Sequence, residues 1–128
     1  MSLRLLNSPA YNNSGNTYLE LEQYEKAGEV YWDVPRKFEQ TKHYDTAVLA
    51  GGKCFFLNGQ YEVARTGLEI VANRDVPEAA EAKMWIGRSF LKDGDAAKAL
   101  ATIDAAIAAH GDSEELPQLL LARVDAIY

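Results

Sequence analysis

The stretch Val48-Leu49-Ala50-Gly51-Gly52-Lys53-Cys54-Phe55 decides the fold, because its spacing of a glycine and an aromatic residue occurs three times in the chain. The first copy is Tyr11-x-x-Ser14-Gly15-x-x-Tyr18 and the third is Lys83-x-x-Ile86-Gly87-x-x-Phe90. The copies are 37 and 35 residues apart, and an alanine follows each, at Ala27, Ala64 and Ala99. A fixed period of roughly 20 to 50 residues predicts a stacked array, and one near about 34 with this pattern predicts paired helices.

The whole chain carries helical patterns, and no strand signal competes with them. Apolar spacing and helix-ending residues predict seven helices, at about 9–22, 24–34, 41–57, 61–73, 78–92, 96–109 and 114–128. Pro35 is expected to kink or end the second helix. Gly59 can close the third in the left-handed conformation. The fold class is therefore all-α.

The repeated small residues have a packing interpretation. Glycine in a helix interior costs about 0.5–1 kcal/mol relative to alanine, so Gly15, Gly52 and Gly87 in register predict close helix contacts. The three alanines meet the same need from the facing helices. Large side chains would fill the space that is left, and they are Tyr18, Phe55 and Phe90 with Tyr31, Leu68 and Ile103 opposite.

Composition limits the classes of function. The chain has 128 residues, of which 48% are hydrophobic and 25% charged, and this is a globular composition. Its net charge of −6 disfavours binding to nucleic acid or to an anionic membrane. No apolar run approaches the ~20 residues of a membrane span, and the amino terminus lacks the apolar core of a signal peptide. We expect a soluble protein, cytoplasmic by default.

At the level of the motif, the chain resembles the tetratricopeptide repeats, whose pattern is Trp-x2-Leu-Gly-x2-Tyr, then Ala-x3-Phe, then Pro. The glycine and the alanine are matched three times each, over roughly residues 8–128. Departures are Lys83 for the opening large residue, Ser14 and Gly51 for leucine, and prolines out of register. The resemblance implies one domain, 1–128, a right-handed superhelix (an α-solenoid) of about 3.5 repeats. Its units are roughly 8–43, 44–78, 79–113 and a half-repeat or capping helix, 114–128.

The resemblance also implies a concave groove, lined by the first helix of each repeat, that binds a peptide or helix of a partner protein. The matching positions are Asn12, Asn16, Leu19, Leu49, Lys53, Phe56, Trp85, Arg88 and Lys92. Arginine can hold a carboxylate bidentately, so an acidic partner is the expectation. The alternative is that the three cations are ordinary solvated charges and that Trp85 packs against a neighbouring helix.

No residue pattern predicts catalysis, a metal site or a cofactor. His43, His110 and Cys54 lack metal-ligand spacing, and Cys54 is expected to be a small core residue. The function expected is a non-catalytic interaction scaffold. The alternatives are an assembly or chaperone module of a bacterial envelope or secretion system, and a regulatory domain of a larger enzyme.

The last helix is apolar on more than one side, with Leu119-Leu120-Leu121 and Ile127-Tyr128. Each unit of a repeat array buries a face against its neighbour, so the ends of the array need polar caps. We expect either a continuing array in a longer protein or a homodimer formed through this C-terminal helix.

Overall fold

The computed structural model describes residues 23–37 and 43–128, and this part of the chain is all helical. Its helices are α3 (Tyr24–Lys37), α4 (Tyr44–Leu57), α5 (Tyr61–Ala72), α6 (Ala79–Lys92), α7 (Ala96–Ala109) and α8 (Leu116–Ile127). They correspond in order to the last six of the seven expected helices. The first expected helix, 9–22, lies outside the described residues, as do Asn12, Asn16, Leu19 and Gly15.

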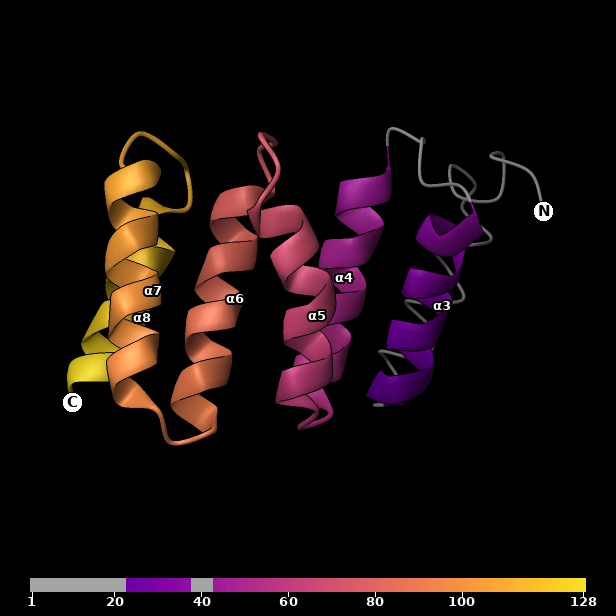
Figure 1. Ribbon diagram of the computed structural model, residues 1–128, viewed down its shortest axis with the longest axis horizontal. Coiled ribbons are helices and arrows are strands. Elements are labelled where there is room, and N and C mark those ends of the chain that lie inside the picture. Colours follow the sequence, from indigo (N-terminus) through magenta and orange to yellow (C-terminus); the bar gives the residue numbers. More distant parts are fainter. Residues whose placement is uncertain (1–22, 38–42) are drawn as a thin grey trace.

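The helices form a row in which each packs against the next along the chain, with α3 and α8 at opposite ends (Figure 1). Contacts also join alternate helices, since α6 touches both α4 and α8. Helices α4, α6 and α8 are therefore neighbours in one layer of the array. This arrangement of consecutive helix pairs is that of an α-solenoid.

Turn residues end the helices where the sequence predicted. Gly59 and Gly94 have φ of 81° and 85°, the left-handed conformation that glycine adopts without a steric penalty. Asp95 begins α7 by accepting a hydrogen bond from the Lys98 backbone nitrogen at 3.0 Å.

Pro35 is the exception among these boundaries. Pro35 was expected to kink or end the helix, and the second of these is wrong, because α3 runs to Lys37, two residues beyond the proline. A proline lacks the N–H that would donate to the carbonyl four residues earlier, and its ring crowds that carbonyl. In the last turn of α3 these two effects do not stop the helix.

The repeated glycines and alanines bring helices close together, as their register predicted. A Cβ added to Gly52 would lie 2.6 Å from Leu68, and one added to Gly87 would lie 2.5 Å from Ile103. Both neighbours are on the following helix, and both are fully buried. Ala27, Ala64 and Ala99 are also fully buried. Cys54 is 2% exposed, as expected for a core residue.

A second contact of this kind was not predicted from the sequence. The indole of Trp32 on α3 packs against the backbone of Gly51 on α4 and Gly67 on α5, where an added Cβ would overlap the ring. Its Nε1 donates a hydrogen bond to the Val48 carbonyl at 2.9 Å, and its ring lies 4.5 Å from that of Phe55. The Trp32 ring therefore packs against both helices of the next unit, α4 and α5.

Candidate functional site

One face of α6 carries a line of charged and aromatic side chains. Glu78 precedes the helix, and Glu81, Trp85, Arg88 and Lys92 follow at intervals of three or four residues, which places them on one side of it. We define the charged face as these five residues with Lys53 of α4 and Glu115, which precedes α8. It follows the layer formed by α4, α6 and α8.

Polar contacts join α4 to α6 across this face. Lys53 Nζ lies 3.0 Å from Glu81 Oε2, an ion pair whose side chains are 41% and 26% exposed. Nearby, the Thr46 hydroxyl donates a hydrogen bond to Glu78 Oε2 at 3.1 Å. The charge of Lys53 is therefore already matched within the protein.

Trp85 is held at the centre of the face by contacts on several sides. Its Nε1 donates a hydrogen bond to Glu81 Oε2 at 3.0 Å, and its ring meets the Phe56 ring edge-on at 5.0 Å. The cations of Lys53 and Arg88 lie 5.8 and 5.5 Å from its ring centre. Such contacts fix the orientation of the indole, so Trp85 is a rigid, partly buried element of the surface.

A second carboxylate, that of Glu115 before α8, lies near Glu81 on the charged face. Burial raises the pKa of Glu115, and the nearby charge of Glu81 raises it further, while Lys53 and Arg88 act in the opposite direction. Glu115 Oε2 and Arg88 Nε are both buried without a hydrogen-bond partner in the described part of the chain. A bound polar group can satisfy such atoms without breaking an existing contact.

The structure divides the expected groove residues into core and surface. Leu49 and Phe56 are buried, at 7% and 9% exposed, and belong to the core that supports Trp85. Lys53, Trp85 and Arg88 are partly buried, and Lys92 is exposed. Glu81 and Glu115 were not among the expected groove residues, although the spacing of Glu81 from Trp85 is a sequence signal for their contact.

The groups with reactive chemistry are in structural positions. Burial raises the pKa of the Cys54 thiol to about 11, so it is protonated and unreactive near neutral pH. Among the described residues, no three His, Cys, Asp or Glu side chains are grouped so that they could hold a metal ion.

His110, at the end of α7, contacts Lys83 of α6, with Nζ 2.9 Å from Nε2. An ammonium can only donate, so the imidazole accepts and is neutral. Burial and then the Lys83 charge lower the pKa of His110 below its ordinary value of 6.5. The unfolded chain then binds the proton more tightly than the folded one. The free energy of unfolding should therefore fall as the pH drops below about 6.5, and the stabilisation by neutral His110 should be fully present above that pH.

Urea denaturation at about pH 7.5 and about pH 5.5 measures this contribution. A His110→Gln variant should lose part of the difference between the two free energies. If the variant shows the same pH dependence as the wild type, protonation of His110 is not its cause.

The row of helix pairs and the surface along α4, α6 and α8 define an all-α repeat protein. Two family models, both described as tetratricopeptide repeat, match residues 49–114 and 8–31, and the first alone covers more than half of the chain. The chain belongs to the tetratricopeptide repeat family. Proteins of this family are typically non-catalytic scaffolds for protein–protein interaction. No curated protein matches the chain.

No helix in residues 23–37 and 43–128 combines the length and the apolar character needed to cross a membrane.

Proposed function

We propose that the charged face binds a peptide or helix of a partner protein, and that the layer of α4, α6 and α8 is the concave groove of the repeat array. The observation that carries the proposal is the constellation around Trp85, where a rigid aromatic side chain lies among charges from three helical segments. Interface energetics favour such aromatic and arginine side chains as anchors.

The chemistry of the partner follows from how the cations are matched. Lys53 is paired with Glu81, and Arg88 lies near the carboxylate of Glu115. These pairings reduce the attraction of the face for a uniformly acidic peptide. An acidic partner therefore stays a prediction from the sequence. Lys92 at the end of the face is exposed and available to a partner.

A charge-reversal experiment tests the proposal. Partners retained by the immobilised wild-type protein should be lost from the double variant Arg88→Glu with Lys92→Glu, because two cations of the face become carboxylates. The matched control is the double variant Lys98→Glu with Arg123→Glu, which makes the same charge change away from the face. In the wild type, Lys98 pairs with Asp95 and Arg123 pairs with Asp104.

Retained proteins are identified by mass spectrometry, and far-ultraviolet circular dichroism checks that both variants keep their helices. Loss of a partner from the first variant alone supports the charged face as the binding site. Retention of the same partners by both variants would contradict it.

A second surface favours self-association, the other interaction expected from the sequence. Helix α8 exposes Leu120, Leu121, Val124 and Ile127 at 46–57%, and Tyr128, which follows the helix, is 98% exposed. Apolar side chains gathered in this way mark interaction sites. We propose a second copy of the chain as the occupant, since α8 is apolar enough along this side to pair with itself. The envelope or secretion module and the enzyme-linked regulatory domain stay alternative settings for either interaction.

Light scattering coupled to gel filtration measures the mass. We expect about twice 14.2 kDa for the wild type and 14.2 kDa for Leu121→Glu, which places a charge in the apolar contact. Ala101→Glu, at an exposed position of α7, should leave the dimer intact. A wild-type protein of 14.2 kDa at high concentration would rule out the homodimer.

A further inference from the structure

The two ends of the charged face carry opposite charge. From this separation we infer that the partner segment is itself dipolar, with basic residues at one end and acidic residues at the other. It would lie along α6 with its basic end over Glu78, Glu81 and Glu115 and its acidic end over Arg88 and Lys92. The inference rests on the proposed function and adds the chemistry and the orientation of the partner.

The end of the face at the start of α6 is acidic. Three carboxylates lie there, Glu78 and Glu81 at the beginning of α6 and Glu115 before α8. The ammonium of Lys53 pairs with Glu81, and both Lys53 and Arg88 lie near Glu115. Burial raises the pKa of Glu115, the charge of Glu81 raises it further, and Lys53 and Arg88 lower it without cancelling the rise, so part of the repulsion between the two carboxylates is left. A cation from a partner would relieve this repulsion.

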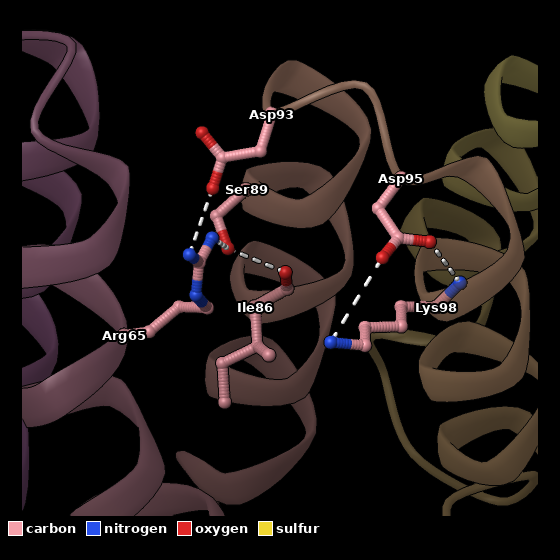
Figure 2. A network of polar contacts seen from close by, with 6 residues as sticks. All are labelled: Arg65, Ile86, Ser89, Asp93, Asp95 and Lys98. Atoms are coloured by element: carbon pink, nitrogen blue, oxygen red, sulfur yellow. Dashed lines mark hydrogen bonds and ion pairs between the residues drawn. The ribbon is translucent and has the colours of Figure 1, made fainter.

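The opposite end of the face is basic. Arg88 and Lys92 lie in the last two turns of α6. The acidic residues that follow are engaged elsewhere, because Asp93 forms an ion pair with Arg65 of α5 at 2.7 Å and Asp95 caps α7. Figure 2 shows both carboxylates turned toward these partners. A carboxylate from a partner would find the exposed Lys92 here, and beside it Arg88, which lies near Glu115 but whose Nε has no hydrogen-bond partner in the described part of the chain.

This order of charges also suits the dipole of α6, which favours acidic residues at its start and basic residues at its end. Glu115 precedes α8 in the same way, so the dipole of α8 favours a carboxylate there too, and it lies near Glu81. The separation of charge therefore belongs to the surface made by α6 and α8 together. Complementary charge of this kind sets the orientation of a partner more than its affinity.

The length of the face limits the size of the segment. Glu78 and Lys92 are 14 residues apart, which in a helix is about 21 Å. A partner helix of about 14 residues, or an extended peptide of about six or seven, spans that distance.

Selection from a displayed library of random 16-residue peptides tests the inference, because such a library offers the face every order of charges. The immobilised wild-type protein is the bait, and the Arg88→Glu, Lys92→Glu double variant removes peptides that bind other surfaces. Enriched peptides should carry basic and acidic residues in separate blocks. Rearranging one such peptide so that its charges alternate, at constant composition, should weaken binding at least tenfold by fluorescence anisotropy.

The outcomes separate the inference from the function on which it rests. Enriched peptides that are uniformly acidic, or that bind equally well after rearrangement, overturn the dipolar partner and leave peptide binding by the face intact. Failure to enrich any peptide that distinguishes the wild type from the double variant counts against the proposed function itself.

Discussion

A Gly51→Leu substitution should lower the free energy of unfolding by at least about 2 kcal/mol, although it moves the chain toward the tetratricopeptide pattern. The position lies within α4, where replacing glycine would by itself gain about 0.5–1 kcal/mol. The gain is outweighed because a Cβ at Gly51 would overlap the indole of Trp32. That ring cannot move aside easily, since it also packs against Gly67 and Phe55.

A double-mutant cycle identifies the cause. Trp32→Ala alone should cost about 3 kcal/mol, through the lost ring contacts and the lost hydrogen bond to the Val48 carbonyl. In that background the space of the indole is free, so Gly51→Leu should cost at least about 1 kcal/mol less than in the wild type. Urea denaturation followed by circular dichroism measures all four proteins, and Gly51→Ala serves as the milder variant if Gly51→Leu does not fold. Additive effects would show that Trp32 is not the obstacle.

The part of the fold that repeats could be predicted from the sequence. Gly52 and Gly87 occupy the same position in two units, and each faces a large side chain of the following helix, so their register reveals the contact. Helix ends marked by Gly59 and Gly94 were also placed correctly, because a left-handed residue is a local requirement.

Trp32 could not be predicted in the same way, because its contacts occur once and join residues far apart in the sequence. The motif treats Gly51 as a departure, and Gly67 has no role in it at all. Only the packing of α3 against the next helix pair shows that the two glycines together accommodate one indole. A departure from a repeat pattern, paired with a second glycine on the neighbouring helix, is the signal that could have revealed it.

The family pattern predicted that some of the candidate residues lie together, but not how their charges are paired, and their role in binding stays a prediction. The family pattern places Lys53, Trp85 and Arg88 near one another, and their contacts bear this out. It does not show that Lys53 pairs with Glu81, or that Glu115 approaches from α8. These contacts depend on how neighbouring helices are offset, and residue spacing within one helix carries no information about that offset.

Arg65→Ala should lower the free energy of unfolding by about 2–4 kcal/mol. The Arg65 side chain of α5 is only 14% exposed, although that of its partner Asp93 is 40% exposed, and it reaches across to α6 (Figure 2). Its guanidinium pairs with Asp93 at 2.7 Å, donates to the Ser89 hydroxyl at 2.9 Å and lies 4.4 Å from the ring centre of Phe90. Removing the guanidinium breaks these three contacts between α5 and α6 at once.

The matched control is Arg123→Ala. Arg123 pairs with Asp104 at the same distance of 2.7 Å, but the two side chains are 43% and 46% exposed. An exposed pair contributes about 1 kcal/mol or less, and salt weakens it further. Denaturation of both variants should therefore show a large loss at Arg65 that persists in about 1 M NaCl, and a small loss at Arg123 that disappears there. Equal losses at the two positions would mean that burial does not strengthen the Arg65 contacts, and that α5 and α6 are held together by their apolar side chains alone.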